Sequence, residues 1–96
     1  MKNDKSIVEI RNGTITWRSE VTGLYHRTDG PAIEYVDGTK EWYFNGLRHR
    51  EDGPAIEHAD GYKAWYVDGK RHRLDGPAIE YPDGRKEFWL FGHKVQ

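Results

Sequence analysis

The residues of this sequence that could do chemistry recur as a His-Arg-x-Asp motif, which begins at His26, His49 and His72. Imidazole and carboxylate groups can bind a metal ion together, but the ligands of a zinc ion must all lie about 2.0–2.1 Å from it. Equivalent positions in successive β-hairpins are separated by two strand spacings, about 9–10 Å. The three histidines therefore cannot share one ion, and we predict no metal site and no cofactor.

The motif belongs to a longer internal repeat. The six residues DGPAIE occur at Asp29–Glu34, Asp52–Glu57 and Asp75–Glu80, 23 residues apart. The earlier segment Val8–Trp17 matches the repeat at a spacing of 25 residues. Stacked repeats need atypical end units that cap the exposed faces. We therefore divide this single domain into a degenerate capping half-repeat, three repeats and a truncated tail, at residues 1–24, 25–47, 48–70, 71–92 and 93–96.

Within each unit, Asn-Gly or Asp-Gly corners predict β-hairpins, because this dipeptide favours two-residue turns with positive φ at both residues. Such a turn fixes the strand register. The register predicts four aliphatic–aromatic pairs on one core face: Val8–Trp17, Ile33–Trp42, Ile56–Trp65 and Ile79–Phe88. Phe44, Val67 and Leu90 extend that face. The expected fold is all-β, a repetitive meander of antiparallel β-hairpins in one elongated, twisted sheet of about seven to nine strands.

Composition narrows the class of protein. The chain has 96 residues, a formal net charge of -1 and no cysteine. Disulfides and thiolate metal sites are thereby excluded, and the charge argues against nucleic-acid binding. No apolar run approaches the roughly 20 residues that span a bilayer. We expect a cytoplasmic protein.

The run Trp42–Gly61 resembles the MORN repeat, which is also about 23 residues long, and Tyr81-Pro82-Asp83-Gly84 matches the last element of that family's pattern. The arms differ from it, with His-Arg-x-Asp-Gly-Pro in place of His-Gly-x-Gly. The chain thus resembles a variant lineage found in small bacterial and phage proteins. The resemblance implies a single-layer meander that serves as a scaffold or interaction module, with membrane-lipid binding claimed for some members, and it implies no chemistry.

The His-Arg-x-Asp segments have two interpretations that can coexist. In the first they are structural: Asp caps a turn, Gly supplies a positive φ, and Arg bonds to Asp or to backbone carbonyl groups. In the second, the arginines form a ladder that binds an anion such as a nucleotide or a lipid headgroup, between repeats or between protomers. The anion-binding candidates are Arg27, Arg50, Arg73, Arg48 and Arg71.

Strand alternation places a second set of candidates on the face opposite the predicted core. An aromatic column there is bordered by acids, and large exposed aromatic side chains mark contact surfaces. The partner-binding candidates are Tyr43, Tyr66, Trp89, Glu34, Glu57 and Glu80. Alternatively, the arms fold back and place Arg27, Arg50 and Arg73 beside these glutamates.

The sequence favours a non-enzymatic function. The acidic pairs Glu34/Glu41 and Glu80/Glu87 could act as general acid and base, but they recur with the repeat on a flat sheet, and the corresponding pair loses one member at Ala64. We predict no catalytic residues. The expected function is a protein-binding module, such as a phage or bacterial inhibitor or adaptor of a host protein; the alternative is the anion binder. Pairing into a homodimer through a face or an open end is expected.

Overall fold

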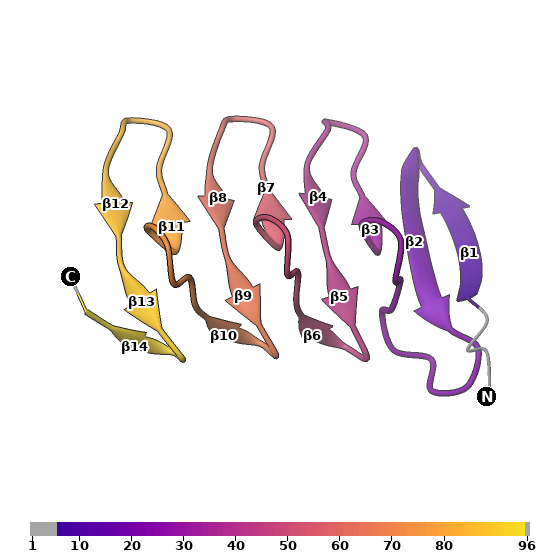
Figure 1. Cartoon of the computed structure of the whole chain (residues 1–96). Coiled ribbons are helices and arrows are strands. Elements are labelled where there is room, and N and C mark those ends of the chain that lie inside the picture. The colour runs from indigo at the N-terminus through magenta and orange to yellow at the C-terminus, as the bar shows by residue number, and fades with distance from the viewer. Residues whose placement is uncertain (1–5, 96) are drawn as a thin grey trace.

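The chain folds into a row of β-hairpins that lie side by side (Figure 1). The computed structural model describes residues 6–95, and within them there is no helix. One antiparallel sheet has eight strands in the order β1-β2-β3-β4-β7-β8-β11-β12. Their bounds are β1 Ser6–Arg11, β2 Thr14–Ser19, β3 Ile33–Glu34, β4 Lys40–Glu41, β7 Ile56–Glu57, β8 Lys63–Ala64, β11 Ile79–Glu80 and β12 Lys86–Glu87. The predicted all-β meander is confirmed.

Three short two-stranded ladders accompany this sheet, one after the Asp-Gly hairpin of each full repeat. They pair β5 (Tyr43–Phe44) with β6 (Leu47–Arg48), β9 (Tyr66–Val67) with β10 (Lys70–Arg71), and β13 (Trp89–Leu90) with β14 (His93–Lys94). The expectation of a single sheet is therefore too simple. The molecule is a slab with extents of 39 × 33 × 16 Å. No helix among residues 6–95 is long and apolar enough to cross a membrane.

The first hairpin has the register that its sequence predicts. Asn12 and Gly13 have φ values of 51° and 84°, so both central residues of the turn are left-handed. Arg11 pairs with Thr14, and further along the hairpin Val8 pairs with Trp17. The two-residue turn and the Val8–Trp17 pair are confirmed.

The Asp-Gly corners of the three full repeats are longer than predicted. Tyr35 N–H donates to the Thr39 carbonyl at 2.8 Å, which encloses a three-residue loop. Gly38 has a φ of 96°, whereas Asp37 stays out of the left-handed region and accepts a hydrogen bond from Thr39 N–H through Oδ1 at 2.8 Å. The carboxylate stabilises this wider loop by mimicking a backbone acceptor.

The wider loop shifts every downstream pair by one residue. Ile33 pairs with Glu41, Ile56 with Ala64 and Ile79 with Glu87. The predicted pairs Ile33–Trp42, Ile56–Trp65 and Ile79–Phe88 are therefore wrong. A bulge accompanies the shift, because Ala32 N–H also donates to the Glu41 carbonyl, at 2.8 Å, so that two residues oppose one.

The bulge explains which side chains form the core. Both residues of each Ala-Ile pair are buried, and one core cluster joins Ala55, Ile56, Ala64, Tyr66 and Ile79. Trp42, Tyr62, Tyr81 and Trp89 pack around this cluster. The core is therefore a row of small and aliphatic residues flanked by aromatic rings.

A second corner in each unit is a two-residue turn with both residues left-handed. The first residues of these turns are Asn45, Asp68 and Phe91, each with a φ of 50°. The histidine at the start of the same repeat caps each turn, because His26, His49 and His72 accept hydrogen bonds from the N–H groups of these residues through Nδ1 at 2.9–3.0 Å. The histidines of the repeated motif thus have a structural role, since each joins the start of its repeat to the turn near the end of that repeat.

We predict that Asn45→Val lowers the free energy of unfolding by about 1–2 kcal/mol, because a β-branched side chain is strained at positive φ. Asn45→Gly should change it by only about 0.5 kcal/mol or less, because glycine adopts this conformation freely. Urea denaturation of the two variants measures the difference. Equal stabilities for the two variants would show that the turn is not left-handed at this position.

Candidate functional site

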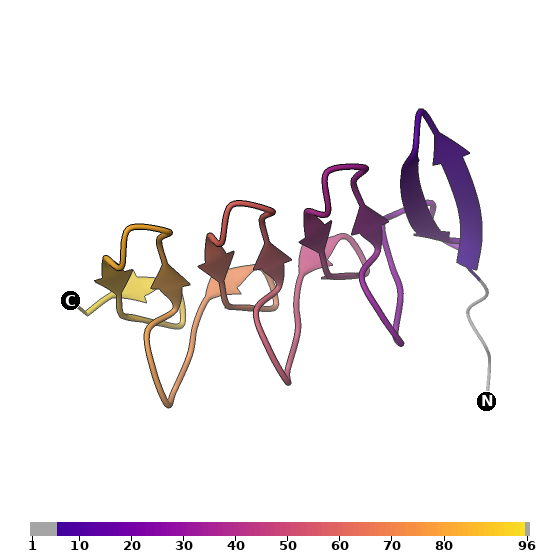
Figure 2. The same cartoon turned by 90° about the horizontal axis from the view of Figure 1, so that it is seen from above.

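Three arms, at residues 26–31, 49–54 and 72–77, project from one side of the sheet at regular spacing (Figure 2). Each arm is closed by its own arginine. In the middle arm, Arg50 Nε donates to Asp52 Oδ1 at 3.1 Å and Nη1 donates to the Pro54 carbonyl at 3.1 Å. The planar guanidinium can make both bonds at once because its donors are held in a fixed fork.

The same guanidinium joins the arm to two other parts of the sheet. Arg50 Nη1 lies 3.0 Å from Glu57 Oε2 on β7, and its Cζ lies 3.8 Å from the centroid of the Trp42 ring in the preceding unit. Arg27 repeats the pattern with Trp17, and Arg73 with Trp65, each at 3.9 Å. Their carboxylate partners are Asp29, Glu34, Asp75 and Glu80.

These contacts confirm that the arginines bond to the Asp of their own arm and that the arms fold back onto the glutamates. The predicted role of the adjacent glycine is wrong. Gly53 does not have a positive φ; instead, a Cβ there would lie 2.9 Å from Arg50 Cζ. Glycine is needed because the guanidinium passes close to the backbone.

The glutamates of the predicted partner-binding set are consequently engaged within the chain. Glu34, Glu57 and Glu80 lie 3.5, 3.0 and 3.3 Å from their arginines. The shifted register also places Lys40 opposite Glu34, where Glu41 was expected. The repulsion expected between paired glutamates does not arise.

The predicted aromatic column is less exposed than expected. Tyr66 keeps only 8% of its surface exposed, and Tyr43 and Trp89 are half-buried. Arg48 lies between Tyr43 and Tyr66, with its Cζ 5.8 and 5.6 Å from their ring centroids. Arg71 donates to the Tyr66 hydroxyl at 3.2 Å and covers Trp89. Two of the five candidate arginines therefore belong to this column, apart from the arms.

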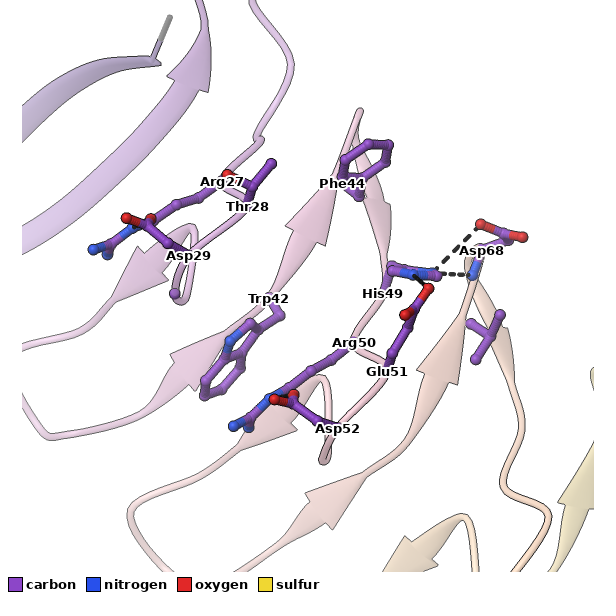
Figure 3. Close-up of a pocket in the computed structure, with 12 residues that line it drawn as sticks. Arg27, Thr28, Asp29, Trp42, Phe44, His49, Arg50, Glu51, Asp52 and Asp68 are labelled. Carbon is purple, nitrogen blue, oxygen red and sulfur yellow. Dashed lines mark hydrogen bonds and ion pairs between the residues drawn. The ribbon is translucent and has the colours of Figure 1, made fainter. Parts of the chain in front are cut away.

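Successive arms enclose a groove; the sequence suggested a site between the Arg-lined arms of repeats or protomers, but not the apolar residues that line it. The groove between the first two arms has a volume of about 870 Å³ and is lined by Arg27, Trp42, Phe44, His49 and Asp52, among others (Figure 3). The next groove has a volume of about 690 Å³ and is lined by the corresponding residues Arg50, Trp65, Val67, His72 and Asp75.

The floor of each groove is apolar and its rims are acidic. Phe44, which the sequence pattern assigned to the core, is 44% exposed and lies on the floor of the first groove. Asp29, Asp52 and Glu51 project at the arm tips with side chains more than four-fifths exposed. The one-residue register error concealed this arrangement, since it placed Phe44 on the same face as the buried isoleucines.

Among residues 6–95, no group of three or more His, Asp or Glu side chains could hold a metal ion. His49 uses Nδ1 to accept from Asp68 N–H, while Nε2 lies 3.4 Å from a Glu51 carboxylate oxygen. Comparisons with family models, curated proteins and solved structures found no match. The arrangement of the arms is therefore the main guide to function.

We predict that Arg50→Lys lowers the free energy of unfolding by about 1–2 kcal/mol, because an ammonium group cannot reproduce the fork and the stacking on Trp42. Arg85→Lys is the control for an exposed arginine, since Arg85 pairs with one carboxylate and its Cζ lies 4.3 Å from the centroid of the Tyr81 ring, with 69% of its side chain exposed. Its effect should be about 0.5 kcal/mol or less. Chemical denaturation measures both, and similar losses for the two variants would contradict the assigned role of Arg50.

Alkaline pH should weaken the fold through Tyr43. Burial, and after it the hydrogen bond donated to Glu41 at 2.8 Å, raises the pKa of Tyr43 to about 12. Because an unfolded tyrosine titrates near pH 10, the stabilisation is complete below that pH and is lost as pH rises toward about 12.

The loss is measured by urea denaturation of the wild type and Tyr43→Phe between pH 9 and about 11. We expect the wild type to lose stability more steeply than the variant, which has no phenol to ionise. If the free energies of unfolding of the two proteins fall in parallel with pH, the ionisation of Tyr43 does not contribute to the loss of stability.

Proposed function

We propose that this chain is a non-enzymatic protein-binding module that binds its partner on the arm face, meaning the three arms and the two grooves between them. The observation that carries the proposal is the repetition of the groove. Each groove has an aromatic or aliphatic floor, one arm on either side, and the same Arg, Asp, Trp and His residues at equivalent positions, while the arm-tip residues differ. An extended partner could make the same contact in both grooves.

Repeated contacts of this kind add in free energy when the spacing of the partner's side chains matches that of the grooves. A mixture of apolar floor and polar rim is typical of protein interfaces. Leu74, at the tip of the third arm, is 80% exposed and lines the second groove. An exposed leucine at that position adds apolar contact area without contributing to the core.

The alternative, an anionic ligand bound by the arm arginines, is disfavoured by their contacts. The side chains of Arg27, Arg50 and Arg73 are only 19–25% exposed, and each already faces two carboxylates. A nucleotide or a lipid headgroup would have to displace those carboxylates, and the exposed acids at the arm tips would repel it.

The repeat unit supports a MORN-like scaffold role for the chain, consistent with an adaptor or an inhibitor that occupies a surface of another protein. Proteins with this type of function need no catalytic group. The proposed site differs from the aromatic column of Tyr43, Tyr66 and Trp89 that strand alternation suggested, because those rings contribute to the core and stack with arginine side chains.

The proposal is tested by affinity capture from bacterial lysate with wild-type protein and a Thr28→Arg/Leu74→Arg variant, compared by quantitative mass spectrometry. Both substitutions lie at exposed arm tips, so the fold should be kept, and they place bulky cations at the grooves. A specific partner should be depleted at least tenfold. Ala59→Arg, on an exposed hairpin loop away from the arms, is the control and should retain the partner. If Thr28→Arg/Leu74→Arg captures as much of the partner as Ala59→Arg does, the binding surface lies outside the arm face.

A further inference from the structure

The two outermost strands of the sheet have complementary edges. Among residues 6–95, β1 is paired only with β2, and β12 only with β11. An unpaired edge presents backbone N–H and C=O groups that can pair with another strand. Inside the sheet, neighbouring hairpins pair through the same kinds of edge. These internal pairs indicate which strand could pair with each outer edge.

The internal template for the β12 edge is the ladder between β4 and β7. There, Lys40 pairs with Glu57 and Glu41 pairs with Ile56, and Trp42 N–H donates to the Ala55 carbonyl at 2.7 Å. The ladder between β8 and β11 repeats the same bonds with Trp65 and Ala78. On the outer edge of β12, Phe88 occupies the position of these tryptophans, so the internal ladders pair its N–H by analogy with the carbonyl of a small residue that precedes an aliphatic one.

The outer edge of β1 offers such a pair. Hydrogen-bonded and non-hydrogen-bonded pairs alternate in an antiparallel ladder, and Arg11–Thr14 closes the two-residue turn as a hydrogen-bonded pair. The backbone groups of Ser6 and Val8 therefore point away from β2. Ser6-Ile7 is a small residue followed by isoleucine, as are Ala32-Ile33, Ala55-Ile56 and Ala78-Ile79.

Charge selects one register for β1 of one molecule against β12 of another. If the Ser6 carbonyl accepts from Phe88 N–H, then Ile7 lies opposite Glu87, as Ile56 lies opposite Glu41, and Glu9 lies opposite Arg85. A shift of two residues in one direction keeps the alternation but places Glu9 against Glu87 and Arg11 against Arg85, and the same shift in the other direction places Glu9 against Asp83. Like charges directly opposite are unfavourable, so the first register is preferred.

We propose that copies of this chain assemble head to tail, with β1 of a second copy continuing the sheet beyond β12 in this register. Ile7 and Val8 of the second copy, which are 50% and 44% exposed in the single chain, become covered at the junction. Leu90 and Val95, which with Phe88 line a small groove of about 360 Å³ at this end, lie next to it.

The interface is heterologous, because a different edge of each copy takes part, and growth does not stop at two copies unless the rotation between copies closes a ring. A two-fold dimer that pairs β1 with β1 is the main competing arrangement. In its most favourable register, Glu9 lies opposite Arg11 of the other copy and Arg85 takes no part. The two arrangements therefore respond differently to charge substitutions.

Sedimentation equilibrium of the full 96-residue chain tests the proposal. The weight-average mass of the wild type should rise with concentration beyond twice the 11.2 kDa of one chain. Glu9→Arg and Arg85→Glu should each weaken association about fivefold or more, since each places like charges opposite one another. Glu20→Arg makes the same charge change outside both edges, at an exposed loop position, and should associate like the wild type.

Mixing the two weakened variants gives the decisive measurement. The arginine introduced at position 9 of one variant then faces the glutamate introduced at position 85 of the other, and the unchanged edges of the two variants also match, so the mixture should regain association. A mass that stays at one chain, an Arg85→Glu variant that associates normally, or a mixture that fails to recover would each overturn the proposal. If Arg85→Glu associates like the wild type while Glu9→Arg associates more weakly, pairing of β1 with β1 of another copy is favoured.

Discussion

The fold depends on one interaction that occurs at each boundary between units, the stacking of an arm arginine on the tryptophan of the preceding unit. The guanidinium lies 3.8–3.9 Å from the ring centroid at all three boundaries. A single-layer sheet has too few aliphatic side chains to bury a thick core, and its largest core residues are isoleucine and tyrosine. The arginine compensates by covering a wide aromatic surface while its charge is balanced by two carboxylates of its own unit. One arginine side chain therefore closes the arm, neutralises the glutamate and joins adjacent units. Loss of that side chain would disrupt all three together.

The repeat, its period and the antiparallel meander could be predicted from the sequence, because DGPAIE recurs at a constant spacing and the chain has turn residues at regular intervals. The fold-back of the arms onto the glutamates was also predictable, as one of two alternatives. The register was not, because the same dipeptide forms different corners. Asp68-Gly69 is a two-residue turn whose first N–H is accepted by His49, 19 residues earlier in the same repeat, whereas Asp37 accepts from Thr39 N–H and widens its loop. The choice depends on contacts with other parts of the chain, which the dipeptide alone does not specify.

That one-residue difference explains why the site could not be found from the pattern. Strand alternation assigned Phe44 to the core and Tyr66 to the surface, and the structure has them the other way round, with Phe44 on a groove floor and Tyr66 buried. The same error occurs in all three full repeats, because they share one sequence pattern and therefore one register. Phe91 shows that the turn geometry is set by the array as well as by local preference. It adopts a φ of 50°, which its side chain disfavours, because His72 accepts its N–H and its ring lies 4.0 Å from the histidine ring.

An array held together by nearest-neighbour contacts has stability that is roughly the sum of its units and their boundaries. Each internal unit here contributes a tryptophan to the next boundary and receives an arginine from it, so its aromatic ring is covered by the chain itself. The last unit differs, since Phe88 takes the place of the tryptophan and no arm within residues 6–95 follows it. The first unit differs in the opposite sense, since its hairpin has a tight turn and a six-residue strand whose apolar side chains are exposed. The same rule that makes the internal units identical therefore makes the two ends different from each other. Within residues 6–95, no strand pairs with the outer edge of β12, and the outer edge of β1 pairs with none; because the two edges differ, they favour a directional rather than a symmetric contact.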